Sequence, residues 1–178
     1  MPSMSSLFPA DLTAHAARLL DALRARSLTL ATAESCTGGL IAGLLTEIAG
    51  ASDVVDSGFV TYSNDAKTEA LGVHPDLIAR HGAVSREVAR AMAEGALIHS
   101  GADVAIAVTG IAGPGGGTDL KPVGLVHLAV ARIGRDTRNA EARFGDIGRS
   151  GVRLATVARA LDLIDTALRH ENDPCPPE

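Results

Sequence analysis

The sequence predicts an α/β fold: a single three-layer α/β/α domain with a mixed, mostly parallel sheet. Short runs of branched aliphatic residues alternate with segments whose apolar residues recur at helical spacing, which is the pattern of this class. The chain has 178 residues, a length that suits one domain with its own core. It is 46% hydrophobic but has only three Phe, one Tyr and no Trp, so the core is expected to be aliphatic.

The first third of the chain is expected to contain two helices and two strands. Residues 11–26 repeat apolar side chains at helical spacing and predict the first helix. Residues 28–33 form a short run with β-branched members, which is typical of a buried strand. Residues 40–48 predict a helix that ends at Gly50, and residues 54–62 predict a second strand with a glycine inside it.

The middle third is expected to be mainly helical before the sheet resumes. Residues 64–71 and 74–80 have the composition of short helical segments. Ser85 opens a longer helix with one apolar face, which stops near Gly101. Residues 103–108 are continuously hydrophobic and predict a third strand, buried on both faces.

Two strands and a helix complete the predicted order. A glycine-rich loop, residues 110–117, follows the third strand. Residues 123–131 predict a fourth strand, residues 137–144 an edge strand and residues 151–169 the closing helix. The predicted organisation is one domain with a flexible segment on either side: residues 11–170 for the domain, residues 1–10 for the N-terminal segment and residues 171–178 for a Pro-rich tail.

Composition and charge exclude several classes of function. The net charge is −5 and the arginines are scattered, whereas a nucleic-acid-binding domain usually carries a basic stripe. Few aromatic residues are available to stack on bases. No stretch approaches the ~20 apolar residues of a membrane span and the N-terminus lacks a signal-peptide pattern, so a cytoplasmic protein without nucleic-acid or membrane partners is expected. Cys36 and Cys175 make no disulfide framework, and no Cys/His spacing resembles a metal site, so no metal or cofactor is expected.

A first candidate segment, residues 33–39 (AESCTGG), joins the first strand to the next helix. In open α/β sheets, ligands gather at the carboxyl ends of strands, where a helix N-terminus presents free N–H groups. Ser35 could therefore attack a carbonyl carbon while such groups bind the oxyanion. An ordinary helix cap with close glycine packing is the alternative. Glu34 is either a structural partner of the helix start or a ligand to substrate, and Cys36 is a rival nucleophile that no histidine is placed to activate.

A second candidate segment combines the only tyrosine with one of the two lysines. Tyr62 and Lys67 lie at the end of the second strand and the start of the next helix. A buried lysine can lose its charge and act as the base toward a serine nucleophile, and a tyrosine hydroxyl can relay a proton. A strand-end tyrosine beside a solvated helix lysine is the alternative interpretation.

Two further segments carry groups that bind anions. The loop of residues 110–117 shares a sheet edge with Ser35, and its glycines let backbone N–H groups converge on a phosphate. It lacks the Gly-Lys-Ser/Thr ending of a Walker A loop. Arg149 and Arg153 are spaced i, i+4 at a helix start, so both can face one way and grip a phosphate or carboxylate. A surface loop and two exposed arginines are the alternatives.

Four motifs occur in order along the chain: ATAESCTGGL, GFVTYSNDAKTEALGV, HGAVSREVARAMAEGA and ADVAIAVTGIAGPGGGTDLKPVG. Together they resemble the CinA C-terminal domain family, the nicotinamide-nucleotide amidases or NMN deamidases, over about residues 11–170. Many members carry an additional N-terminal molybdopterin-binding-like domain. The length of this chain therefore points to the stand-alone amidase form.

The resemblance implies hydrolysis of nicotinamide mononucleotide to nicotinic acid mononucleotide and ammonia by a homo-oligomer, without metal or cofactor. In the family a serine nucleophile works with a lysine and a tyrosine, and the matching residues are Ser35, Lys67 and Tyr62. Residues 144–149 (FGDIGR) match the closing motif of the family, and Arg149 matches its arginine. This segment is one residue longer than the commoner Phe-x-Gly-Asp-Arg form, although the expected Val-Arg pair follows as Val152-Arg153. The predicted substrate-binding residues are Glu34, Thr37, Gly38, Gly39, Thr109, Gly110, Gly116, Gly117, Arg149 and Arg153.

In the expected mechanism Lys67 removes the proton of Ser35, which attacks the carboxamide carbon, and Tyr62 holds or relays that proton to the leaving ammonia. The N–H groups of residues 37–39 are expected to stabilise the oxyanion. Thr109, residues 110–117 and one arginine are expected to bind the 5′-phosphate. Two alternatives stay open: a non-catalytic binding protein associated with competence or DNA damage, and an amidase for another nucleotide carboxamide.

Overall fold

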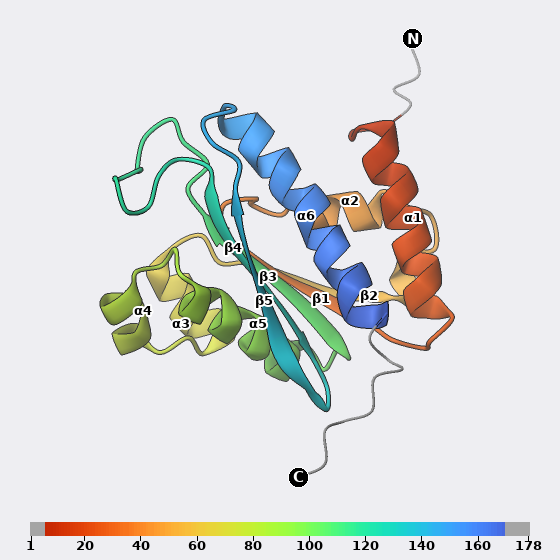
Figure 1. Cartoon of the computed structure of the whole chain (residues 1–178). Coiled ribbons are helices and arrows are strands. Elements are labelled where there is room, and N and C mark those ends of the chain that lie inside the picture. The colour runs from red at the N-terminus through yellow and green to blue at the C-terminus, as the bar shows by residue number, and fades with distance from the viewer. Residues whose placement is uncertain (1–5, 170–178) are drawn as a thin grey trace.

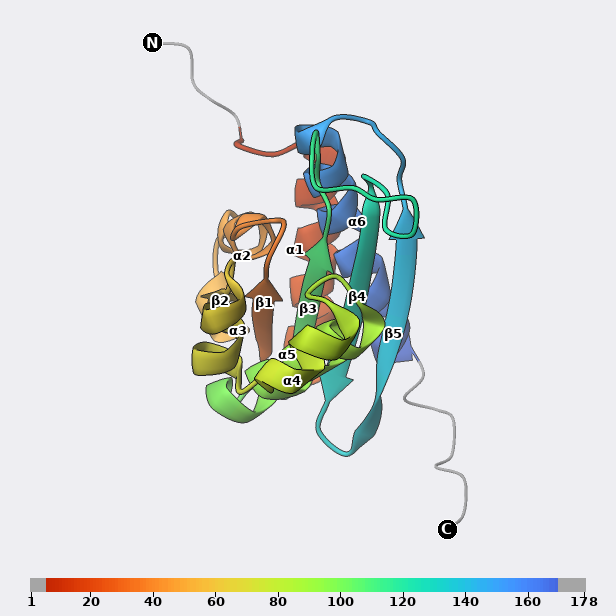
Figure 2. The ribbon, with the colours of Figure 1, turned by 90° about the vertical axis from the view of Figure 1, so that its left-hand side faces the viewer.

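The computed structural model describes residues 6–169 and contains one five-stranded sheet between two layers of helices (Figures 1 and 2). The strands are β1 (Leu30–Glu34), β2 (Val55–Val60), β3 (Val104–Gly110), β4 (Leu125–Arg132) and β5 (Arg135–Arg143), in the spatial order β2-β1-β3-β4-β5. β1 pairs in parallel with β2 and β3, whereas β4 is antiparallel to both β3 and β5. Four of the five strands therefore run in one direction, which confirms the mixed, mostly parallel α/β prediction.

The helices divide between the two faces of the sheet, as Figure 1 shows. They are α1 (Ala10–Arg24), α2 (Leu40–Thr46), α3 (Asn64–Leu71), α4 (Pro75–His81), α5 (Arg86–Ser100) and α6 (Arg149–Arg169), with a 3-10 turn, η1 (Ala51–Asp53), before β2. One core cluster joins the sheet to α1, α2 and α6, and a second joins it to α3, α4 and α5. The buried side chains are nearly all aliphatic, because the sequence offers few aromatic residues to fill the space. Within residues 6–169 no helix is long and apolar enough to cross a membrane.

Local sequence signals account for most helix boundaries. The Ser63 hydroxyl accepts a hydrogen bond from the third residue of α3, and Gly72 closes that helix at φ 68°. The Ser85 hydroxyl caps α5 in the same way. α6 begins at Arg149, two residues before the predicted start, because the helix already follows Gly148 at φ 79°.

The two segments predicted to be flexible fall mostly outside the described residues. Residues 1–5 and 170–178, which include the whole Pro-rich tail, are not described. In the described part of the N-terminal segment, Phe8 packs against the first core cluster and α1 already begins at Ala10.

The sheet register brings three carboxyl strand ends together. Glu34, the last residue of β1, lies beside Val60 of β2 and Val108 of β3. The Ser35 N–H donates to the Val108 carbonyl at 3.1 Å, and the Thr61 N–H donates to the Glu34 carbonyl at 2.9 Å. The segments that follow β1, β2 and β3, which carry the predicted chemistry, therefore meet at one edge of the sheet.

Candidate active site

Ser35 and Lys67 meet at this edge although 32 positions separate them in the sequence. The Lys67 Nζ lies 3.1 Å from the Ser35 Oγ. Ser35 directly follows β1, and Lys67 lies in α3 after the parallel partner β2, so the β1–β2 pairing sets their distance. Lys67 is only 1% exposed. The solvated-lysine alternative is therefore excluded by the structure.

Burial shifts the protonation equilibrium of Lys67 toward the neutral amine. Its Nζ donates to the carbonyl oxygen of Thr61 at 2.8 Å and to those of Tyr62 and Ser63 at 3.4 Å. Burial lowers the pKa of Lys67 from the ordinary 10.5, because the charged ammonium loses its water, and the neighbouring Cys36 acts weakly in the opposite direction. In its neutral form the amine keeps two N–H donors, one for the Thr61 carbonyl and one for either of the two longer contacts, and gains a lone pair that can take the Ser35 proton.

The hydroxyl of Tyr62 contacts an arginine and not Lys67. It accepts a hydrogen bond from Arg149 Nη2 at 2.8 Å, while Arg149 Nη1 donates to the Gly113 carbonyl at 2.9 Å. Lys67 donates to the main-chain oxygen of Tyr62, and the Tyr62 side chain is largely exposed. Arg149 therefore connects the end of β2 with the glycine-rich loop.

Glu34 shapes the turn that carries Ser35. Its buried carboxylate accepts hydrogen bonds from the Thr37 hydroxyl at 2.5 Å and from the N–H groups of Gly39, Ile41 and Ala42 at 3.1, 3.0 and 2.9 Å. These N–H groups belong to the start of α2, where a helix has unpaired donors and favours negative charge. Of the two alternatives for Glu34, the structure shows the structural one.

The same turn limits which groups can bind an oxyanion. The Gly39 N–H is bonded to Glu34, and the Gly38 N–H donates to the Ser35 carbonyl at 3.1 Å. The expectation that residues 37–39 jointly supply the donors is therefore corrected for both glycines, since both N–H groups already have acceptors. The N–H groups nearest the nucleophile, those of Cys36 and Thr37, are the remaining candidates in the turn.

A cavity of about 260 Å³ opens beside Ser35. Five predicted site residues line it: Ser35, Tyr62, Gly110, Gly116 and Arg149. Four others, Ile111, Ala112, Gly113 and Gly115, belong to residues 110–117, the loop expected to bind the phosphate. Cys36 also lines the cavity, and its position next to Ser35 is the only signal in the sequence that indicates this.

Several predicted substrate-binding residues do not line this cavity. The residues concerned are Glu34, Thr37, Gly38, Gly39, Thr109, Gly117 and Arg153. The buried Thr109 hydroxyl donates to the Ala83 carbonyl at 2.9 Å, because Thr109 faces the α5 side of the sheet. Arg153 Nη2 donates to the Thr37 carbonyl at 2.9 Å, so the arginine supports the Ser35 turn from α6.

Cys36 is poorly suited to be the nucleophile. Burial raises the pKa of its thiol to about 11, because the thiolate would lose its water, so the unreactive thiol form dominates near neutral pH. Among residues 6–169, no group of three or more His, Cys, Asp or Glu side chains could hold a metal ion.

Comparison with known proteins decides the family. The model of the CinA C-terminal domain matches residues 12–168. The chain belongs to the CinA C-terminal domain family. It is 54% identical over 149 residues to a CinA-like protein of Akkermansia muciniphila, a match that covers 84% of this chain and 36% of the relative. The chain thus spans about a third of the length of the curated relatives it matches.

Solved CinA-family structures agree with the fold. A competence/damage inducible protein from Agrobacterium tumefaciens superposes with a TM-score of 0.89 at 56% identity, covering 92% of this chain and 99% of that one. A competence damage-inducible protein from Klebsiella pneumoniae gives 0.83 at 40% identity, covering 91% and 98%. The family resemblance and the fold class predicted from the sequence are thereby confirmed.

Proposed function

We propose that this CinA-family chain is an amidohydrolase that converts nicotinamide mononucleotide to nicotinic acid mononucleotide and ammonia. The observation that carries the proposal is the buried Lys67 amine, 3.1 Å from the Ser35 hydroxyl beside an open cavity. A lysine with a lowered pKa next to a serine is the arrangement that activates a serine for attack on an amide.

The proposed reaction proceeds through an acyl-enzyme. Lys67 takes the Ser35 proton as Oγ bonds to the carboxamide carbon, and the carbonyl oxygen becomes an oxyanion. That proton then passes to the amide nitrogen, the C–N bond breaks and ammonia leaves an ester on Ser35. Water, deprotonated by Lys67, hydrolyses the ester and releases the carboxylate. We assign the oxyanion to the N–H groups of Cys36 and Thr37, which follow the nucleophile as in other serine hydrolases.

The part of the cavity lined by Arg149 and the glycine-rich loop suits a phosphate. Gly113, Gly115 and Gly116 bring backbone close to the cavity, and Arg149 lies on the same wall. Arg149 uses two N–H groups for Gly113 and Tyr62, and a guanidinium has five, so donors remain for an anion. This arrangement supports a phosphorylated substrate, with Tyr62 held by the arginine that would bind the phosphate.

Ammonia release from four related amides tests the proposal. Nicotinamide mononucleotide is expected to be hydrolysed, whereas nicotinamide, the riboside and the dinucleotide are expected to react at least about tenfold more slowly in kcat/KM, because they lack the terminal phosphate contact. Ser35→Ala is the control for contaminating activity. Equal rates on the riboside would contradict phosphate recognition, and no release from any amide would favour a non-catalytic binding role.

The pH dependence of kcat/KM tests the role of Lys67. Only the neutral amine accepts a proton, so the rate is expected to rise with pH and to level off at the pKa of Lys67, below the ordinary 10.5. The sign follows from the direction of the shift, because protonated Lys67 is the inactive form. Rates measured from about pH 6 to 10 in buffers of constant ionic strength provide the profile. A rate that falls with rising pH across that interval would contradict Lys67 as the base.

A further inference from the structure

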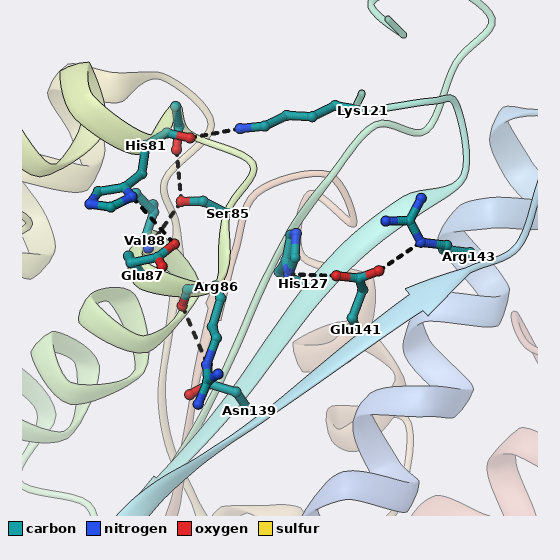
Figure 3. Close-up of polar contacts among 11 residues, drawn as sticks. His81, Ser85, Arg86, Glu87, Val88, Lys121, His127, Asn139, Glu141 and Arg143 are labelled. Atoms are coloured by element: carbon teal, nitrogen blue, oxygen red, sulfur yellow. Dashed lines mark hydrogen bonds and ion pairs between the residues drawn. The ribbon is translucent and has the colours of Figure 1, made fainter. Parts of the chain in front are cut away.

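Lys121, the second of the two lysines, lies outside the cavity wall but makes a short contact with a distant helix. It belongs to the segment of residues 111–124 between β3 and β4, and its Nζ donates to the His81 carbonyl at 2.6 Å (Figure 3). His81 is the last residue of α4, where carbonyl groups lack partners within the helix and the helix dipole is negative. An ammonium group is therefore well placed at this position.

The backbone next to the His81 carbonyl leaves room for the Lys121 amine. Gly82 follows His81 with φ 77°, and a Cβ atom there would lie 2.9 Å from the Lys121 Nζ. Any larger residue would be strained in this conformation and would displace the amine. The Ser85 hydroxyl donates to the Gly82 carbonyl and the Thr109 hydroxyl to the Ala83 carbonyl, both at 2.9 Å. The acceptor segment is thus fastened to α5 and to the sheet.

The other end of the contact connects to the cavity wall. Lys121 closes a turn with Thr118, whose hydroxyl accepts from the Lys121 N–H at 3.0 Å and whose N–H donates to the Lys121 carbonyl at 2.8 Å. Two residues later, Val123 packs against the wall: a Cβ atom on Gly113 would lie 2.7 Å from a Val123 methyl. The Gly113 carbonyl also accepts the hydrogen bond from Arg149. A shift of Lys121 would therefore be transmitted to the wall and to Arg149.

We propose that Lys121 is a positioning residue whose contact with His81 holds residues 111–124 in the conformation that forms the cavity wall. The kinetic consequence rests on the proposed function, but the ordering of the segment does not. Ser35 and Lys67 are held by β1 and α3, which do not depend on this contact. Loss of the contact therefore weakens substrate binding and leaves the chemical step nearly unchanged.

Hydrogen exchange of the amides in residues 111–124 tests the ordering directly. Lys121→Met and Lys121→Gln remove the charge, and both are expected to speed exchange of this segment by about tenfold or more, because a charge-assisted hydrogen bond is lost. Lys121→Arg restores a cation and is expected to stay within about threefold of the wild type. Arg18→Met, at an exposed position on α1, is the matched control and is expected to change nothing.

Steady-state kinetics on nicotinamide mononucleotide separate positioning from a general loss of structure. Lys121→Met is expected to raise KM about tenfold with kcat within about threefold, and Lys121→Arg to restore KM. Unchanged exchange in both neutral variants would overturn the proposal, as would faster exchange with a loss confined to kcat. If the wild type hydrolysed none of the amides, the proposed function would fail while the exchange data would still decide the role of Lys121.

Discussion

Replacing Lys67 with methionine is expected to lower kcat/KM for nicotinamide mononucleotide by about a thousandfold, because the Ser35 hydroxyl loses the amine that lies 3.1 Å away. Methionine has a similar length and fills the same buried space. The carbonyls of Thr61, Tyr62 and Ser63 lose a donor, which is expected to lower the free energy of unfolding by about 1–3 kcal/mol. The variant should therefore fold, and urea unfolding monitored by circular dichroism checks this beside the ammonia assay.

Lys67→Arg distinguishes the role of Lys67 as a proton acceptor from its role as a hydrogen-bond donor to the carbonyls. An arginine keeps donors for the carbonyls but stays protonated in proteins, so it cannot take the Ser35 proton. It is expected to be as inactive as the methionine variant. Activity within about tenfold of the wild type in either variant would show that Lys67 is not the base.

Removing the Glu34 carboxylate is expected to produce the largest loss of stability. Glu34→Ala leaves the Thr37 hydroxyl and three N–H groups at the start of α2 without their acceptor inside the core. Each buried unpaired group costs about 1–3 kcal/mol, and partial relaxation of the turn is expected to hold the total near 3–5 kcal/mol. Chemical denaturation measures the free energy of unfolding.

Two variants show whether the carboxylate itself is responsible. Glu34→Gln keeps the shape but places an N–H₂ group opposite N–H donors, so an intermediate loss of about 2 kcal/mol is expected. Glu69→Ala, at an exposed glutamate of α3, is the matched control and is expected to stay within about 0.5 kcal/mol of the wild type. If Glu34→Ala were as stable as Glu69→Ala, the hydrogen bonds to Glu34 would not stabilise the turn.

The two candidate segments around Ser35 and Lys67 show which features of the site local sequence patterns predict and which they do not. The neighbours of Ser35 alone predict its position after a strand and before a helix, and the structure confirms it. Whether Lys67 was buried or solvated stayed open, because a helix of eight residues with weak apolar periodicity does not show which side faces the core. The β1–β2 register, a contact between distant segments, decides it.

Thr109 and Lys121 make contacts that local sequence patterns do not predict. Thr109 stands in a glycine-rich motif and was expected to bind substrate, but strand alternation turns its hydroxyl toward Ala83. Lys121 lies in the same motif, and the sequence does not indicate which group it contacts. Its acceptor, the His81 carbonyl, lies 40 positions away at the end of α4. The polar residues of one motif are thus distributed over different sides of the sheet edge.

The sequence by itself determined the α/β class, the order of helices and strands, the aliphatic core and the family. The fold class, the order of the elements and the aliphatic core follow from composition, periodicity, capping and turn residues, which depend on neighbours a few positions apart, and the family follows from the resemblance of four motifs. Only the tertiary structure decided that Lys67 is buried and contacts Ser35. It also decided that Glu34 accepts hydrogen bonds from the turn after Ser35 and that Tyr62 contacts Arg149. Those contacts join segments whose distance is set by strand register and helix packing, which are long-range properties that local patterns do not specify.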